Sequence, residues 1–145
     1  MRLRIVAGEL GGRYVGVPGG ARGLRPTQER LREALGSMLT GRIPDARFAD
    51  LCAGTGVVGF ELLSRGAHSG VFVESDRRRL RRLRRDAVAL NLETRCTIVG
   101  ADMHSFVRRC GERFDIVYYD PPYADKRLAA LLPRVAALVQ GDGVL

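Results

Sequence analysis

The chain has 145 residues, 46% hydrophobic and 28% charged, a composition that fits one globular domain and excludes a disordered chain. The formal net charge is +8 and arginine supplies all but one of the 24 basic residues, which indicates a polyanionic partner, nucleic acid first, or a mere preference for arginine. No apolar run approaches the ~20 residues of a membrane span, and the N-terminus lacks a signal peptide, so we predict a cytoplasmic protein without membrane association. The cysteines and histidines lack metal-ligand spacing, so we predict no metal site.

Residues 3–7 and 13–17 are predicted to form a short hairpin, because the Gly11-Gly12 pair between them supplies the positive φ that a tight turn needs. We interpret residues 1–24 as a basic β-hairpin arm. So small an arm buries little surface alone and must pack on the main domain, on another chain or on nucleic acid. The candidates for contact with nucleic acid are its arginines and one at the junction: Arg2, Arg4, Arg13, Arg22 and Arg25.

Residues 25–145 are expected to form one α/β domain. Thr27 is a suitable N-cap for a helix that continues to about Leu39. After it, strands and helices alternate, which predicts a mostly parallel sheet with helices on both faces. The strands are predicted at 48–51, 70–74, 95–99 and 114–120, and the helices between and after them end near residues 65, 90, 110 and 139. Residues 141–145 have the pattern of the first residues of another strand, so we expect a C-terminally truncated domain whose last strands are missing.

The turn from Asp50 to Gly59 lies between a predicted strand and a predicted helix. Its glycines allow a tight turn and a close approach of a ligand to the backbone. Glu74 ends the next strand, where a carboxylate can accept hydrogen bonds from two ribose hydroxyls. The spacing Gly54-x-Gly56-x-x-Gly59 also fits a dinucleotide fingerprint, but Asp50 disfavours a pyrophosphate and tolerates a cationic adenosyl ligand. The alternative is a structural turn followed by a surface acid.

Two later features stay open between two interpretations. The run Arg77 to Arg85 has Leu80 and Leu83 on an apolar stripe, and its cationic face is either merely solvated or contacts phosphates. Asp102 follows the third strand of the domain, where it can accept a hydrogen bond from an adenine amine or cap the helix that begins there.

Asp120-Pro121-Pro122-Tyr123 follows the fourth strand of the domain. Two prolines cannot continue a strand in the middle of a sheet, so the strand ends and leaves a carboxylate, a rigid turn and a phenol at its carboxyl edge. In open α/β sheets ligands bind at that edge. The alternative is a Pro-Pro turn with a packing tyrosine. We expect this corner and the glycine turn to lie side by side.

These stretches resemble the class I S-adenosylmethionine (SAM)-dependent methyltransferases, and more closely the RsmD-type family, bacterial 16S ribosomal RNA guanine-N2 methyltransferases. Nearly the whole chain is covered by the matching stretches, which are Arg4–Gly8, Arg25–Leu35, Asp50–Gly59, Leu63–Ala67, Phe72–Asp76 and Asp120–Tyr123. Asp-Pro-Pro-Tyr is shared with other amino-methyltransferases, whereas the arm and the Arg-Pro-Thr helix point to this family. Gly36 departs from the family pattern, which usually has a large apolar residue there.

The resemblance implies a Rossmann-like sheet, SAM as the cofactor, and methylation of the exocyclic N2 of guanine 966 in 16S rRNA or the small ribosomal subunit by a monomer. It implies that the cofactor is held by Asp50, Cys52, Ala53, Gly54, Gly56, Glu74, Ser75 and Asp102. The implied catalytic residues are Asp120, Pro121, Pro122 and Tyr123. Asp120 and the Pro121 carbonyl would accept the two N–H bonds of the amino group, and Tyr123 would stack on the base.

Two other functions remain open from the sequence. The Asp-Pro-Pro-Tyr motif also serves DNA adenine N6-methyltransferases. A domain with an incomplete sheet could instead be a catalytically inactive RNA-binding module. A cytosine-C5 enzyme is disfavoured, because that chemistry needs a nucleophilic cysteine and none adjoins the Pro-Pro turn in the sequence.

Overall fold

The computed structural model describes residues 1–18, 26–121 and 127–145. Within them, a parallel sheet has the order β5-β4-β3-β6-β7, and β1 and β2 form a separate antiparallel pair. The sheet strands are β3 (Arg47–Asp50), β4 (Ser69–Glu74), β5 (Cys96–Gly100), β6 (Phe114–Tyr118) and β7 (Val139–Val144). The α/β class, the parallel sheet and the N-terminal hairpin predicted from the sequence are therefore confirmed.

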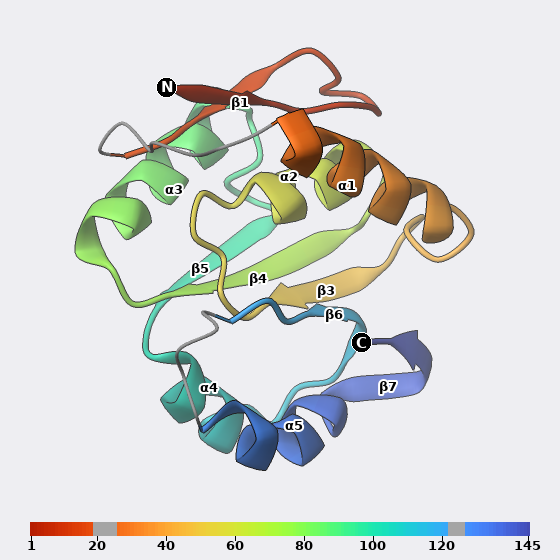
Figure 1. The fold of residues 1–145 in the computed structure, drawn as a ribbon, viewed down its shortest axis with the longest axis vertical. Helices are drawn as coiled ribbons and strands as arrows, with labels where there is room; N and C mark the ends of the chain where they lie inside the picture. The colour runs from red at the N-terminus through yellow and green to blue at the C-terminus, as the bar shows by residue number, and fades with distance from the viewer. Residues whose placement is uncertain (19–25, 122–126) are drawn as a thin grey trace.

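Helices cover the two faces of the sheet (Figure 1). On one face lie α1 (Pro26–Met38), α2 (Val57–Ser64) and α3 (Arg77–Ala89). On the other face lie α4 (Met103–Arg109) and α5 (Leu128–Ala136). No helix in the described part of the chain is long and apolar enough to cross a membrane.

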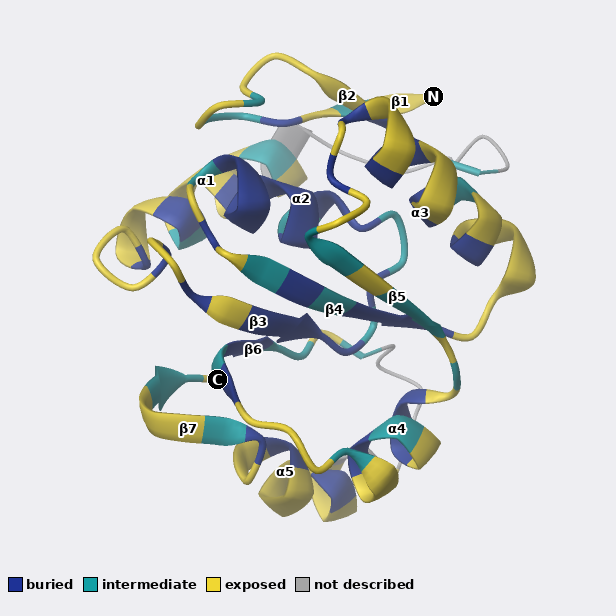
Figure 2. Ribbon diagram, turned by 180° about the vertical axis from the view of Figure 1, so that it is seen from behind, coloured by how far each residue is buried: buried dark blue, intermediate teal, exposed yellow. Residues whose placement is uncertain are grey.

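The core consists of two apolar layers, one on each face of the sheet (Figure 2). Neighbouring residues of β3 face opposite layers, so Phe48 joins the α2 side and Ala49 the α5 side. Phe48 and Phe72 meet edge to face with ring centroids 5.6 Å apart. Gly70 has no side chain because the ring of Phe48 occupies the space that its Cβ would take.

The hairpin arm consists of β1 (Arg2–Arg4) and β2 (Tyr14–Gly16), and it packs on the helices of the main domain. Both strands are shorter than predicted, and Leu3 pairs with Val15. Ile5 and Val15 are fully buried in the same core layer as Phe48. The predicted boundary between residues 24 and 25 lies outside the described residues.

Buried polar side chains of the helices bind the arm's backbone. The Glu61 carboxylate, 3% exposed, accepts hydrogen bonds from the backbone N–H groups of Val6 and Ala7 at 3.0 and 3.1 Å. Ser64 Oγ accepts from the N–H of Leu10 at 2.9 Å. Asp86 of α3 accepts from the N–H of Gly16 at 3.0 Å. The arm therefore packs on the main domain, one of the three alternatives that the sequence left open, although the sequence did not indicate which helices hold it.

One predicted boundary near the C-terminus is wrong. The helix expected to end near Val139 ends at Ala136, and Val139 begins β7. Val139 pairs with Phe114, whose N–H donates to the Leu138 carbonyl at 2.7 Å. The apolar spacing of Leu131, Val135 and Leu138 continues into Val139, so periodicity alone could not show where the helix stops.

Candidate active site

Four strands of the sheet end at the same edge. The register pairs Asp50 with both Phe72 and Tyr118, and it pairs Glu74 with Gly100. The chain runs outward from β3 through β4 to β5 and then returns to place β6 on the other side of β3. Such a reversal of strand order leaves a crevice at the carboxyl ends of the strands, where ligands bind in α/β sheets.

The glycine turn after β3 is anchored on both sides. The Leu51 N–H donates to the Tyr118 carbonyl of β6, and the Ala53 N–H donates to the Val73 carbonyl of β4, each at 3.0 Å. Gly54 and Gly56 have φ values of 56° and 76°, which favour glycine. A Cβ on Gly56 would also collide with the side chain of Leu83 in α3. The glycine turn and the Asp120-Pro121 corner therefore flank the same point of the sheet.

A cavity of about 460 Å³ opens at this edge, and it contains both parts of the predicted site. Its walls include Cys52, Glu74, Ser75 and Asp102 of the predicted cofactor residues, and Asp120 and Pro121 of the predicted catalytic residues. Asp50, Ala53, Gly54 and Gly56 do not line it and lie in the end of β3 and the turn beside it. The predicted residues Pro122 and Tyr123 lie outside the described residues.

Glu74 is 7% exposed and holds the turn in place. Its carboxylate accepts hydrogen bonds from the N–H of Gly54 at 2.9 Å and of Asp76 at 2.8 Å. Arg79 of α3 approaches it at 3.8 Å and also lines the cavity. Each carboxylate oxygen can accept a second hydrogen bond, so Glu74 retains capacity for the hydroxyls of a ligand.

Asp50 is a buried carboxylate next to the cavity. It is 1% exposed, and its Oδ1 has no hydrogen-bond partner among the residues that the structure describes. Burial, opposed by a hydrogen bond from the Cys52 backbone N–H and assisted by the charges of Glu74 and Asp120, raises the pKa of Asp50 to about 7. A cation bound in the cavity would favour the ionised form of this group.

Asp102 combines the two interpretations that the sequence left open. It is the N-cap of α4, where its carboxylate accepts from the Ser105 N–H at 3.4 Å, and it also lines the cavity. A capping carboxylate can still accept a hydrogen bond from a ligand, because only part of its acceptor capacity is used.

Tyr118 is a half-buried residue that the sequence did not single out. Burial, followed by the charges of Asp120 and Asp50 and a hydrogen bond to the Asp120 side chain, raises the pKa of Tyr118 to about 12. The phenol therefore stays protonated and donates to Asp120. Side chains alternate between the two faces of a strand, so residues 118 and 120 are expected on the same side. This spacing was the sequence signal that could have identified Tyr118.

Cys52 and Met103 form the sulfur-containing part of the wall, with Cys52 Sγ 3.3 Å from Met103 Sδ. The thiol thus shares a cavity with Asp120 although it is remote in sequence. Burial, followed by the charges of Asp50, Glu74, Asp120 and Asp102, raises the pKa of Cys52 to about 12. A thiol held protonated is not the nucleophile of a cytosine-C5 enzyme.

The sequence did not assign six further residues that line the cavity, which are Leu51, Val73, Arg79, Ala101, Met103 and His104. Of these, Arg79 lies in the first turn of α3, and Met103 and His104 begin α4. All three lie within about five residues of a predicted strand end, and this position in the chain was the only available signal.

The arm arginines differ in whether their side chains already bind another group of the protein. Arg2 is exposed, and no ion pair joins it to another described residue. Arg4 is paired with Glu29 at 2.8 Å, and Arg13 donates to the Ala89 carbonyl at 2.7 Å. Arg22 and Arg25 lie outside the described residues.

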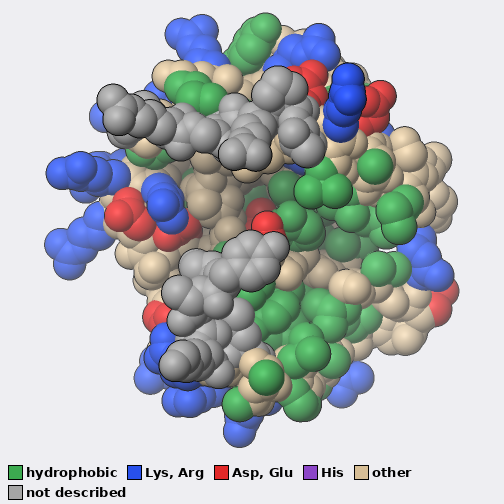
Figure 3. All heavy atoms as spheres, viewed as in Figure 1, with side chains coloured by type: hydrophobic (Ala, Val, Ile, Leu, Met, Phe, Trp, Pro, Cys, Tyr) green, Lys and Arg blue, Asp and Glu red, His purple; other side chains and the backbone are tan. Residues whose placement is uncertain are grey.

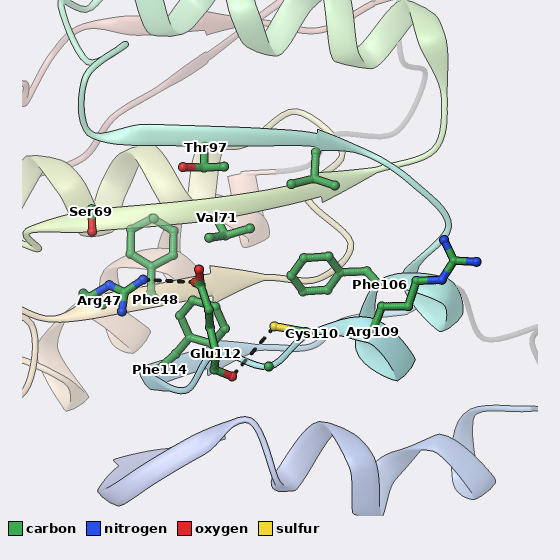
Figure 4. Close-up of a pocket in the computed structure, with 13 residues that line it drawn as sticks. Arg47, Phe48, Ser69, Val71, Thr97, Phe106, Arg109, Cys110, Glu112 and Phe114 are labelled. Carbon is green, nitrogen blue, oxygen red and sulfur yellow. Dashed lines mark hydrogen bonds and ion pairs between the residues drawn. The ribbon is translucent and has the colours of Figure 1, made fainter.

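A second cavity of about 360 Å³ lies at the opposite edge of the sheet (Figure 4). Its walls include Val71, Val99 and Phe106, and the ion pair between Arg47 and Glu112, with 3.1 Å between nitrogen and oxygen, lies across it. It contains none of the predicted site residues and lies near the first residues of β3 and β4. The candidate active site is therefore the cavity at the carboxyl edge.

Comparisons with known proteins identify the family of the chain. A family model described as "Conserved hypothetical protein 95" matches residues 3–145. Ribosomal RNA small subunit methyltransferase D of Escherichia coli K12 is 34% identical over 144 residues, which cover 99% of this chain and 70% of that protein. The protein of the same name from Haemophilus influenzae is 32% identical over 124 residues, 83% of this chain and 64% of that protein. A hypothetical protein of Thermus thermophilus has a similar structure, with a TM-score of 0.82, 35% identity, and coverage of 97% of this chain and 82% of that one. The chain therefore belongs to the Conserved hypothetical protein 95 family, the RsmD-type methyltransferases.

Proposed function

We propose that the chain is a SAM-dependent methyltransferase that modifies ribosomal RNA. The observation that supports this most is the single cavity in which the turn-holding Glu74 and the Asp120-Pro121 corner meet. Relatives named ribosomal RNA small subunit methyltransferase D support RNA as the substrate. We further propose the exocyclic N2 of a guanine, position 966 of 16S rRNA, as the methyl acceptor, in naked RNA or in the small subunit.

The residues of the cavity fit SAM. Glu74 has acceptor capacity for two ribose hydroxyls, and Asp102 can accept from the adenine amine. The buried Asp50, with its unpartnered Oδ1, places a carboxylate where a cationic ligand would be stabilised. When bound, SAM supplies a methyl group on a positively charged sulfur, a strong electrophile.

The task left to the protein is to activate a poor nucleophile. The lone pair of the guanine amine is delocalised into the ring, so the nitrogen must be pulled toward tetrahedral geometry. Asp120 and the Pro121 carbonyl would accept its two N–H bonds and orient the lone pair, which is catalysis by positioning and electrostatics. The Tyr118 hydroxyl donates to Asp120 and would fix its rotamer, so Tyr118 is a positioning residue.

Access to this cavity restricts the substrate further. The amine of a base-paired guanine takes part in pairing, so the target base must be unpaired or flipped out. Stacking on Tyr123, which lies outside the described residues, would hold the base in place.

The test is methyl transfer from radiolabelled SAM to 16S rRNA, to small ribosomal subunits and to duplex DNA. We expect label in the RNA or the subunits, and N2-methylguanine after nuclease digestion and mass spectrometry. Label in DNA as N6-methyladenine would assign the chain to DNA. Tight RNA binding without SAM affinity by calorimetry would show an inactive binding module. Light scattering after gel filtration would test the proposed monomer.

A further inference from the structure

Helix α3 has a cationic outer face that has no role in the site described above. Its apolar stripe of Leu80, Leu83 and Ala87 is buried against the core, and the opposite face is exposed (Figure 2). We define the α3 arginine face by the exposed arginines of the helix other than Arg79, which pairs with Glu74. They are Arg77, Arg78, Arg81, Arg84 and Arg85.

Among the residues that the structure describes, none of the five side chains of the α3 arginine face makes an ion pair. Of the nearby carboxylates, Glu93 lines a surface pocket together with Arg84 but forms no ion pair with it. The other three are engaged elsewhere. Asp76 caps the helix by accepting from two backbone N–H groups, and Asp86 binds Arg82 and the backbone of Gly16. Glu74 has Arg79 beside it.

This arrangement destabilises the isolated helix. Arg77 and Arg78 lie in the first turn, where the helix dipole is positive and repels cations. Arg81 lies three or four residues from Arg77, Arg78, Arg84 and Arg85, a spacing at which like charges repel. A solvent-exposed helix face often carries both signs of charge, whereas this one carries only positive charges. The burial of the apolar stripe offsets their mutual repulsion, and a polyanion bound from outside would relieve it.

The position of the face links the arm to the candidate active site. Arg79 in the first turn of α3 lines the cavity beside Glu74. At the other end of α3, Arg13 of the arm donates to the Ala89 carbonyl. Arginine side chains project from the side of the molecule where α3 lies and from the arm above it (Figure 3).

We propose that the α3 arginine face binds the sugar–phosphate backbone of the RNA substrate between the arm and the active site. The inference rests on the proposed function, because it takes RNA as the partner. A helix of 13 residues spans ~20 Å, long enough to follow several phosphates of one strand. Guanidinium groups donate two parallel hydrogen bonds to phosphate oxygens, so a row of arginines suits this ligand.

The experiment compares two triple variants of equal charge. In the test variant, Arg78, Arg81 and Arg85 are replaced by Gln. In the control, the exposed Arg108, Arg113 and Arg134, on the α4 and α5 side, are replaced by Gln. Binding of a full-length 16S rRNA transcript is measured across a salt series. We expect the slope of log Kobs against log salt to fall by about two units in the test variant, at ~0.7–0.9 per lost phosphate contact, and to stay at the wild-type value in the control.

Two further measurements distinguish lost phosphate contacts from a damaged fold or a damaged SAM site. The test variant should unfold at the same or a higher temperature than wild type at low salt, and its SAM affinity by calorimetry should be unchanged. An unchanged slope in the test variant, or an equal loss in the control, would overturn the inference while wild-type methyl transfer still supports the proposed function. Loss of binding to phosphatidylglycerol vesicles with an unchanged RNA slope would also overturn it. A wild-type protein that methylates neither the transcript nor small ribosomal subunits would refute the proposed function itself.

Discussion

At the residue scale, Asp50 shows what a buried carboxylate beside the candidate active site costs the stability of the fold. Its carboxylate is buried, and its pKa is raised to about 7 mainly by that burial. In the unfolded chain the group ionises near its ordinary pKa of about 4. Between these values the folded state retains a proton that the unfolded state has lost, so ionisation of Asp50 disfavours the folded state as pH rises.

Asp50→Asn should therefore stabilise the ligand-free protein at pH 8 more than at pH 5. As pH rises from about 4 to about 7, ionisation of this group lowers the free energy of unfolding of the wild type by up to about 4 kcal/mol. Above pH 7 this contribution no longer changes. The variant lacks this loss. Urea unfolding at pH 5, 6, 7 and 8 measures the difference, and a difference that is constant with pH would contradict the assigned environment.

The same group should make SAM binding depend on pH. Below pH 7 a cationic ligand must displace the proton of Asp50, so wild-type affinity should rise with pH up to about 7 and then level off. In Asp50→Asn the dependence should disappear and the affinity should be lower. Calorimetry in two buffers of different ionisation enthalpy would detect the released proton.

Asp120 and Tyr118 should affect turnover in graded amounts. Asp120→Ala removes the acceptor of the amine and should lower kcat by more than tenfold with SAM affinity intact. Tyr118→Phe removes only the hydroxyl that donates to Asp120 and should lower kcat by a smaller factor. An Asp120→Ala enzyme with wild-type turnover would exclude Asp120 from the mechanism.

Some of these residues could be predicted from the sequence and others could not. Asp50, Glu74 and Asp120 each end or follow a strand at a turn marked by glycine or proline, and such local chemistry is visible in a single sequence. The burial of Asp50 and the meeting of Cys52 with Met103 depend on how β3 and α4 approach in space. Nothing local indicates those contacts.

At the element scale, the attachment of the arm to α2 depends on one buried acid. Glu61 accepts from the Val6 and Ala7 N–H groups and lies 3.8 Å from Arg32 and 3.4 Å from Arg65. Both arginines are largely buried. Removal of the carboxylate would leave cations and N–H donors without their partner, which costs more than an exposed pair can contribute.

Glu61→Ala should lower the free energy of unfolding by about 3–5 kcal/mol. The matched control is Glu29→Ala, which also removes an acid bound to an arginine near the arm. The Arg4–Glu29 pair has side chains 48% and 40% exposed, so its loss should change stability by less than about 1 kcal/mol. Urea unfolding measures both, and hydrogen exchange at Val6 and Ala7 should accelerate only in the Glu61 variant. Equal effects would contradict the buried contact.

An acid within the apolar sequence of α2 was the signal for this contact, although the sequence could not show what Glu61 binds. The partner lies at the other end of the primary structure, in Val6 and Ala7. Gly36 is similar. It departs from the family pattern, and the guanidinium of Arg65 occupies the space that a side chain at this position would take. The periodicity of apolar residues predicts that a helix or strand exists. Which side chains pack against it depends on residues far away in the sequence.

At the scale of the whole molecule, the arm and the main domain share a core. Ile5 and Val15 are fully buried in the layer that contains Phe48, Phe60 and Phe72. We therefore propose that the arm is an integral part of the fold, although it is distinct in sequence and charge.

Deletion of residues 1–24 should thus abolish cooperative folding rather than produce a stable domain without RNA affinity. The deletion exposes the apolar surface that covers Ile5 and Val15, and it leaves Glu61 and Asp86 without their backbone donors. Circular dichroism melting of the shortened chain measures this. The control is the full chain with Arg2→Gln, which should melt like wild type because no ion pair joins that arginine to another described residue. A cooperative transition in residues 25–145 alone would show that the arm is a separate unit.

The order of the sheet strands has a consequence for how the chain is made. β3 is the central strand, yet one of its neighbours, β6, is encoded far downstream, and Phe48 pairs with Ile116. While a ribosome synthesises the chain, β3 and β4 can pair early, but β3 keeps an open, aggregation-prone edge until β6 emerges. The Asp120 corner arrives with that same strand, so closure of the nascent sheet and assembly of the catalytic centre are a single late event.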